Sequence, residues 1–107
     1  MLFRSREWSA VLVLKGPCTV VASPDGEVFS HDRPNPALAT AGTGDVLSGC
    51  IAALLASGLD PFRAACAGVA VHGEAAALVA SEVGERGALA TDVLDRLPRA
   101  IAALAAR

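Results

Sequence analysis

Residues 41–49 read Ala-Gly-Thr-Gly-Asp-Val-Leu-Ser-Gly, and the character of the sequence changes inside this stretch. Before it, Pro34 and Pro36 interrupt regular structure, which predicts a loop over residues 31–41. From Thr43 onward, apolar residues recur three and four positions apart, as is typical of an amphipathic helix, and Gly58 supplies a stop. The sequence therefore predicts a glycine-containing loop that opens directly into a helix.

The chain upstream of this loop has the features of strands. The continuous apolar run over residues 11–14 predicts a strand buried on both faces of a parallel sheet, ending at Lys15. Two β-prone segments, residues 19–22 and 27–30, flank a Ser-Pro-Asp-Gly turn. Such a turn between two such segments predicts a β-hairpin.

The chain downstream predicts two more helices. Asp60-Pro61 is a favourable N-cap and first-turn pair, which predicts a helix over residues 61–82. Thr91-Asp92 opens a third helix, in which Pro98 introduces a kink or a restart. One or two core strands cannot cover this many apolar helix faces. We therefore expect residues 1–107 to form a single partial domain, incomplete or completed by a partner.

Composition excludes several classes of protein. At 107 residues, 53% hydrophobic and 19% charged, the chain suits one small folded domain. Its net charge of −2, without a basic stripe or an aromatic platform, argues against nucleic acid as a partner. Neither a signal peptide nor an uninterrupted apolar span is evident, so we expect a soluble protein with no membrane partner. The cysteines at positions 18, 50 and 66 lack Cys-x-x-Cys spacing, which predicts buried free thiols in a cytoplasmic protein and no zinc site.

The Gly-Thr-Gly-Asp segment is the first candidate for chemistry. Gly42 and Gly44 allow the backbone unusual dihedral angles and a close approach to a ligand. The helix start beyond them presents unpaired N–H groups that favour phosphate oxygens. Asp45 would repel a phosphate, so it fits the role of a base or a metal contact better. An isolated Gly-x-Gly-Asp is equally compatible with a plain loop and helix cap, but neither a Walker A loop nor a Rossmann fingerprint occurs.

Lys15 is the second candidate. It is the only lysine beside eight arginines, and it follows the predicted strand, where open α/β sheets place ligand sites. A solvated strand terminus is the plainer interpretation. A compact ammonium that reaches a phosphate would also explain the choice of lysine. Thr19, four residues on, adds a hydroxyl within reach of the same nucleotide.

Beyond these features, the run from Asn35 to Gly49 closely resembles the signature of NAD(P)H-hydrate dehydratases in the ribokinase-like superfamily. Upstream of it, Val13-Leu14-Lys15-Gly16 resembles the family's strand and nucleotide-binding turn. Downstream, Val71-His72-Gly73-Glu74 and Leu89-Ala90-Thr91-Asp92 resemble its later helices in the same order. The resemblance covers nearly all of the chain after residue 10. It implies an α/β fold, namely the C-terminal strands, hairpin and three helices of a three-layer α/β/α sandwich.

The resemblance also implies an activity and a set of roles. The family uses ADP or ATP to dehydrate the S epimer of NADHX or NADPHX (the hydrated cofactors) to NADH or NADPH, a carbon–oxygen lyase reaction of cofactor repair. Asp45 would be the catalytic base and contact the hydrate, and Mg²⁺ would bridge phosphate oxygens without an assigned protein ligand. The implied nucleotide-binding residues are Lys15, Gly16, Pro17, Cys18, Thr19, Gly42, Thr43 and Gly44. The resemblance further suggests a homo-oligomer.

The chain departs from the family in length, since the family's domain is more than twice as long. Its N-terminal half, which supplies much of the hydrate pocket, has no counterpart here, so we expect weak or no dehydratase activity from the chain alone. Two alternatives stay open. One is a related ribokinase-like kinase acting on a hydroxymethylpyrimidine, a thiazole or a sugar, and the other is a non-catalytic nucleotide-binding remnant.

The two histidines and the tryptophan are weaker candidates. His72, in the middle of a predicted helix, is interpreted as a hydrogen-bonded packing residue, and the resemblance places it with Ala75 beside the adenine. His31, at the exit of the hairpin, is interpreted as solvated. Trp8 is interpreted as a packing residue on an N-terminal helix.

Overall fold

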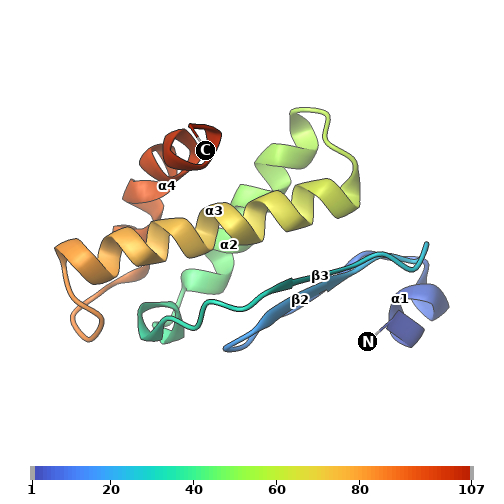
Figure 1. Cartoon of the computed structure of the whole chain (residues 1–107), viewed down its shortest axis with the longest axis horizontal. Coiled ribbons are helices and arrows are strands. Elements are labelled where there is room, and N and C mark those ends of the chain that lie inside the picture. The colour runs from blue at the N-terminus through green and yellow to red at the C-terminus, as the bar shows by residue number, and fades with distance from the viewer. Residues whose placement is uncertain (1, 107) are drawn as a thin grey trace.

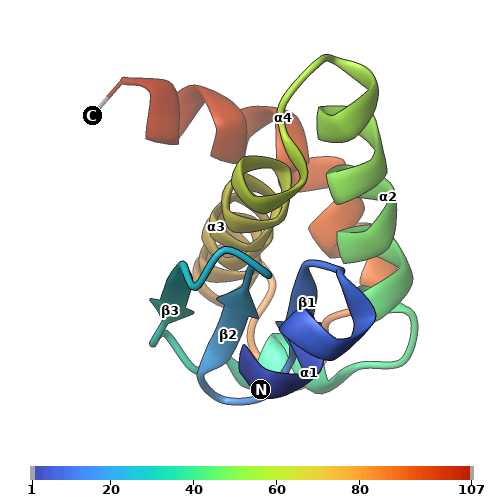
Figure 2. The same ribbon diagram turned by 90° about the vertical axis from the view of Figure 1, so that its right-hand side faces the viewer.

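A computed structural model describes residues 2–106 as a three-stranded sheet with helices against it (Figure 1). Figure 2 shows α3 between the sheet and the end of α4, with α2 beside it. The elements in chain order are α1 (Leu2–Trp8), β1 (Leu12–Leu14), β2 (Thr19–Ala22), β3 (Val28–His31), the 3₁₀ helix η1 (Pro36–Ala39), α2 (Thr43–Ala56), α3 (Pro61–Glu82) and α4 (Ala90–Ala105).

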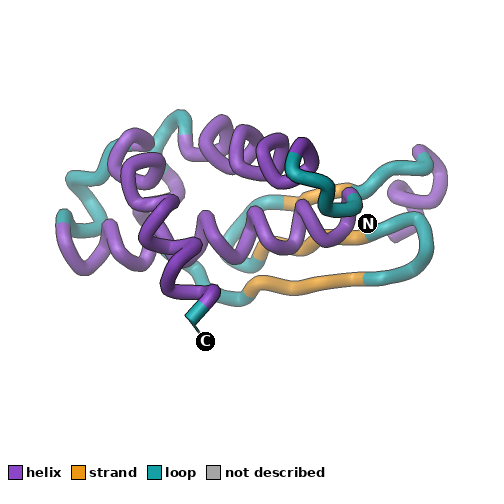
Figure 3. Tube along the Cα trace, turned by 90° about the horizontal axis from the view of Figure 1, so that it is seen from above, coloured by secondary structure: helices purple, strands orange, loops and turns teal. Residues whose placement is uncertain are grey.

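The sheet has the strand order β1-β2-β3. Its register aligns Val13, Val21 and Phe29 in one row across the three strands. All three side chains belong to the hydrophobic cluster shared with α2 and α3. The strands run roughly along the axis of α3 (Figures 1 and 3), which packs on the face of the sheet that carries this row.

The predicted hairpin is confirmed, but the prediction for the first strand is wrong in two respects. Within residues 2–106, β1 pairs with β2 in the antiparallel direction, and no parallel pair is formed. Leu14 is 60% exposed, so β1 is not buried on both faces. An apolar run indicates that a strand packs against apolar neighbours. It does not indicate whether the partner strand runs parallel or antiparallel.

The three predicted helices are confirmed with close boundaries. Asp60 caps α3 by accepting a hydrogen bond from the amide of Arg63 at 3.0 Å. At the start of α4, the side chain of Asp92 accepts from the amide of Leu89 at 2.7 Å. Pro98 lies inside α4 without ending it.

Helix α3 is the central element of the core. Its side chains join two apolar clusters, one with α4 and η1 and one with α2 and the sheet. It is also the one helix in residues 2–106 that is long and apolar enough to cross a membrane, yet 61% of its apolar window is buried inside the protein. Burial of this kind is what the core helix of a folded domain requires.

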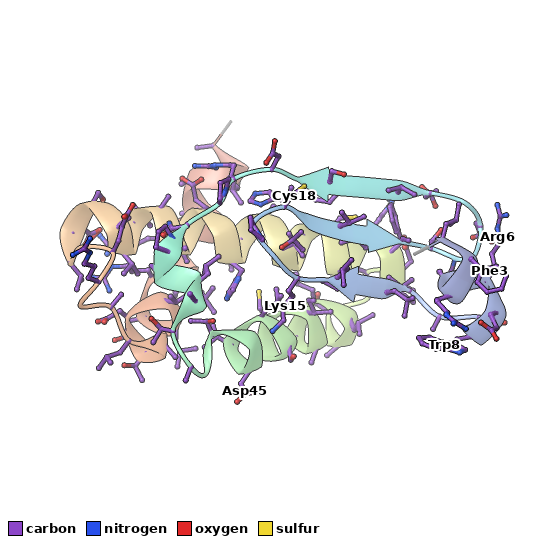
Figure 4. The ribbon with its side chains drawn as sticks, turned by 90° about the horizontal axis from the view of Figure 1, so that it is seen from below. Phe3, Arg6, Trp8, Lys15, Cys18 and Asp45 are labelled. Carbon is purple, nitrogen blue, oxygen red and sulfur yellow. The ribbon has the colours of Figure 1, made fainter. Side chains whose placement is uncertain are left out.

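Two interpretations of single residues are corrected by the structure. Cys18 is exposed, although Cys50 and Cys66 are partly buried, and all three thiols are free. Trp8 is 60% exposed, and its ring lies beneath the guanidinium of Arg4 at 5.8 Å rather than in the core. The two residues lie at opposite ends of β1, Trp8 in the short helix before the strand and Cys18 in the turn after it (Figure 4).

Candidate functional site

A cavity of about 520 Å³ lies where β1, β3, α2 and α3 converge. Its walls come from four separate segments of the chain: the β1–β2 turn, the loop after β3, the start of α2 and the middle of α3. The lining residues are Lys15, Gly16, Pro17, Thr19, His31, Arg33, Pro34, Asn35, Pro36, Leu38, Ala39, Thr43, Gly44, Leu47, Val69, His72 and Gly73. The fold thus brings most of the predicted nucleotide-binding residues to one cavity, although Thr19 and Thr43, the nearest lining members of the two predicted segments, lie 24 positions apart in sequence.

Lys15 of the β1–β2 turn and Gly44 of α2 lie side by side. Lys15 extends from the end of β1 toward α2 (Figure 4), and a Cβ added to Gly44 would overlap its Nζ atom. A larger residue at this point of α2 would displace the end of the Lys15 side chain from its present position. The ammonium lies at the helix N-terminus, where both the dipole and the unpaired amides also favour an anion.

The conformation of the turn before α2 depends on the left-handed backbone of Gly42 and on hydrogen bonds from the Thr43 hydroxyl. Gly42, the N-cap residue, has a φ of 93°, a left-handed value that glycine adopts without strain. The buried hydroxyl of Thr43 donates toward the carbonyl oxygens of Leu38 at 2.7 Å and Thr40 at 3.0 Å. The hydroxyl is thus used to close the turn, and the turn fixes where α2 begins.

The amides at the start of α2 differ in their partners. The N–H of Thr43 donates to the carbonyl of Thr40 at 3.3 Å. Within residues 2–106, the N–H groups of Gly44 and Asp45 have no hydrogen-bond partner. Unpaired amides at a helix start bind anions readily, so Gly44, on the cavity wall, is the first amide free for a ligand.

His72 also lines the cavity and is confirmed as a buried, hydrogen-bonded residue. Its Nε2 atom lies 2.9 Å from the carbonyl oxygen of Thr43. Burial lowers the pKa of His72, and the nearby charges of Lys15 and His31 lower it further against the opposing effect of the Thr43 bond. The ring is therefore neutral at neutral pH. Ala75, paired with His72 in the sequence interpretation, is fully buried and lies outside the cavity lining.

Asp45 lies outside this cavity. It is exposed in the first turn of α2 and points outward, away from the sheet (Figure 4). A second cavity of about 340 Å³ lies between β1 and α2 and shares Lys15, Gly44 and Leu47 with the first. These three residues thus line both cavities, and neither cavity is lined by Asp45.

Sequence reasoning missed part of the cavity wall. His31 is half-buried against Gly73 of α3 instead of being solvated, and burial lowers its pKa, with the charge of Arg33 acting in the same direction. Arg33 lines the cavity and pairs with the buried Glu74 at 3.2 Å. No local pattern marks these residues, because the wall exists only once β3 packs on α3.

The predicted site residues divide as follows. Six of them line the cavity: Lys15, Gly16, Pro17, Thr19, Thr43 and Gly44. Three do not: Cys18, Gly42 and Asp45. Cys18 is exposed within the β1–β2 turn, and Gly42 contributes its left-handed backbone to the turn rather than a surface to the cavity.

Comparison with known proteins places this arrangement in a family. A family model described as NAD(P)H-hydrate dehydratase matches residues 4–99. A bifunctional NAD(P)H-hydrate repair enzyme from Moorella thermoacetica is 51% identical over 94 residues, which are 88% of this chain and 18% of that protein. An ADP-dependent (S)-NAD(P)H-hydrate dehydratase from Neisseria meningitidis is 51% identical over 77 residues, or 72% of this chain and 26% of that protein.

A solved structure agrees with these sequence relatives. The ADP/ATP-dependent NAD(P)H-hydrate dehydratase from Bacillus subtilis, co-crystallised with ATP and Mg²⁺, superposes with a TM-score of 0.83 at 39% identity. The match covers 95% of this chain and 38% of that one. This supports the expected ribokinase-like dehydratase fold, and the chain spans well under half the length of each of these relatives.

Proposed function

This chain belongs to the NAD(P)H-hydrate dehydratase family, and we propose that it supplies the nucleotide-phosphate side of an ADP- or ATP-dependent (S)-NAD(P)H-hydrate dehydratase. In this reaction, the hydroxyl of the hydrated nicotinamide ring takes the terminal phosphoryl group of the nucleotide. Loss of that group as phosphate then restores the double bond of NADH or NADPH.

One observation carries the proposal: the cavity that unites the β1–β2 turn with the free amide of Gly44. Lys15 supplies a positive charge beside that amide, and Gly44 leaves the space that the charge occupies. A cation together with helix-terminal N–H groups is the arrangement that binds the terminal phosphates of a nucleotide. The apolar remainder of the cavity, including Val69 and Leu47, suits a flat base.

Asp45 is the proposed base. Its carboxylate follows the free amides directly along the chain but points away from the nucleotide cavity (Figure 4). A phosphoryl group held at Gly44 would thus lie between the nucleotide and an acceptor that approaches from the side of Asp45. In this position the carboxylate takes the proton of the acceptor hydroxyl as the hydroxyl attacks phosphorus.

We expect Mg²⁺ to bind through the phosphates of the nucleotide rather than through a cluster of protein side chains. Within residues 2–106, no three His, Cys, Asp or Glu side chains cluster closely enough to hold a metal ion by themselves. Mg²⁺ commonly binds through substrate phosphates, with few protein ligands and several waters. When bound, it would neutralise charge on the phosphates, and Lys15 and the Gly44 amide would bind the oxygens left free.

Calorimetry on the purified chain tests this function. We expect ADP with Mg²⁺ to bind the chain, and adenosine to bind much more weakly because it lacks the phosphates that Lys15 and Gly44 contact. Hydrated NADPH should not turn over, since the chain spans only 38% of the Bacillus subtilis enzyme. Equal affinity for adenosine and ADP would contradict the phosphate site. Turnover at a rate typical of a complete enzyme would contradict the proposal that the chain supplies only the nucleotide-phosphate side of the active site.

A chimera tests the reaction itself. In it, the chain replaces the matching 38% of the Bacillus subtilis enzyme. We expect the chimera to convert hydrated NADPH to NADPH with release of phosphate. Accumulation of a phosphorylated acceptor without elimination would instead identify a kinase.

A further inference from the structure

The peptide between Thr43 and Gly44 is held from one side by α3. The Nε2 atom of His72 lies 2.9 Å from the carbonyl oxygen of Thr43, and the imidazole ring is only 6% exposed. A carbonyl oxygen accepts hydrogen bonds and donates none, so Nε2 must carry the proton. The interaction therefore fixes the tautomer of His72 and adds a second restraint to the Thr43 carbonyl, which α2 already aligns along its axis.

Restraining this carbonyl also restrains the amide of Gly44. A peptide unit is planar and trans, so the C=O of Thr43 and the N–H of Gly44 point in opposite directions within one rigid plane. The Gly44 N–H is also the first free amide of α2, since Thr43 N–H is used by Thr40. A rotation of the peptide plane would turn this N–H away from the proposed phosphate position beside Lys15.

The ring itself has little freedom to move. His72 lies in the middle of α3, the helix that joins both apolar clusters. The neighbouring Gly73 lies against the ring of His31, so β3 also packs beside this part of α3. The titratable groups that act on His72 from other elements are Lys15 at the end of β1 and His31 on β3. Both disfavour a second proton on the ring, which leaves Nδ1 free of a proton and Nε2 as the donor.

We propose that His72 is a positioning residue, which aims the amide of Gly44 at a phosphate of the bound nucleotide through its hydrogen bond to the carbonyl of Thr43. This inference rests on the proposed function, because the phosphate is the ligand that the amide is aimed at. A positioning role differs from a packing role. A packing residue would stabilise the fold, and its loss would not weaken phosphate binding more than binding of the rest of the nucleotide. A positioning role also differs from direct contact with the base, which would affect adenosine and ADP alike.

Two substitutions in the full chain separate these roles. His72→Leu removes the donor and replaces the imidazole with an apolar side chain of moderate size. His72→Gln returns an N–H donor on a longer, flexible side chain. Amide chemical-shift titrations measure affinity for ADP with Mg²⁺ and for adenosine, and they remain accurate for weak ligands. If the leucine variant does not fold, His72→Asn, which is too short to reach Thr43, takes its place.

The expected results are specific to phosphate. Loss of one net hydrogen bond should weaken ADP binding about 3- to 10-fold in His72→Leu, leave adenosine binding unchanged, and be largely reversed in His72→Gln. An equal loss for both ligands, no loss for either, or a glutamine variant as weak as the leucine variant would overturn the inference.

A second readout needs no nucleotide. In the unliganded wild-type chain, the ring nitrogen shifts of His72 should report a neutral imidazole protonated at Nε2. In His72→Leu, the Gly44 amide should shift and exchange with solvent faster, while amides near Asp95 on α4 should not. An unchanged Gly44 amide would overturn the positioning role even if ADP binds. If the wild-type chain binds no ADP but the Gly44 amide responds, the proposed function fails and the alignment by His72 stands.

Discussion

Replacing Asp45 with asparagine in the chimera should lower the rate of dehydration by about 10²- to 10⁴-fold, the range over which a positioned general base contributes. Asparagine keeps the size of the side chain but cannot take a proton from the acceptor hydroxyl. Because Asp45 is exposed and lies outside the nucleotide cavity, ADP affinity should change by no more than about fivefold. Single-turnover kinetics with hydrated NADPH and calorimetry with ADP measure the two effects separately.

The matched control for this substitution is Asp95→Asn. Asp95 is an exposed carboxylate on α4, outside the lining of both cavities described above. The control removes the same charge and should leave both rate and affinity at wild-type values. A near-normal rate in Asp45→Asn would show that another group is the base. A fall in ADP affinity as large as the fall in rate would place Asp45 in nucleotide binding instead.

The second large effect is expected from Lys15→Ala, which should weaken ADP binding to the chain by about 10- to 100-fold. This corresponds to the loss of a charge-assisted hydrogen bond of about 1.5–3 kcal/mol. Adenosine binding should change little, since the ammonium lies beside the free amide of Gly44 and thus on the phosphate side of the cavity. Calorimetry with both ligands at one salt concentration measures the difference, because added salt screens an exposed charge.

Two controls accompany Lys15→Ala. Arg86→Ala removes the same charge from the loop between α3 and α4, outside the lining of the nucleotide cavity, and should leave ADP affinity unchanged. Lys15→Arg keeps the charge but not the compact shape, and a guanidinium meets the crowded surface at Gly44. We expect it to restore affinity only in part. Unchanged affinity in Lys15→Ala would mean that the ammonium does not contact phosphate.

The helices could be predicted from the sequence because their ends are determined locally. Asp60 and Pro61 mark the start of α3 through a side-chain cap and a residue without an amide proton. Gly58, with a φ of 106°, ends the preceding segment in the same local way. The direction of β1 could not be predicted, because strand pairing depends on partners distant in sequence. An apolar run is compatible with either direction.

The part of the site that is encoded by short local motifs could also be predicted from the sequence. Lys15 and Gly44 belong to short motifs whose chemistry is visible in the sequence, and the fold does bring them together. The wall formed by His31 and Arg33 depends on the packing of β3 against α3, which no local pattern encodes. The hydrogen bond from His72 to Thr43 spans 29 positions, so its existence could be learned only from the folded chain.

The structure of the chain bound to ADP and Mg²⁺ would test the central claim most directly. The measured quantities are the distances from the terminal phosphate oxygens to the amide nitrogen of Gly44 and to Nζ of Lys15. We expect both to be hydrogen-bond distances of about 2.7–3.2 Å, with the side chain of Asp45 directed away from the nucleotide. A nucleotide whose phosphates lie elsewhere, leaving the Gly44 amide without a partner, would contradict the assignment of this turn as the phosphate cradle.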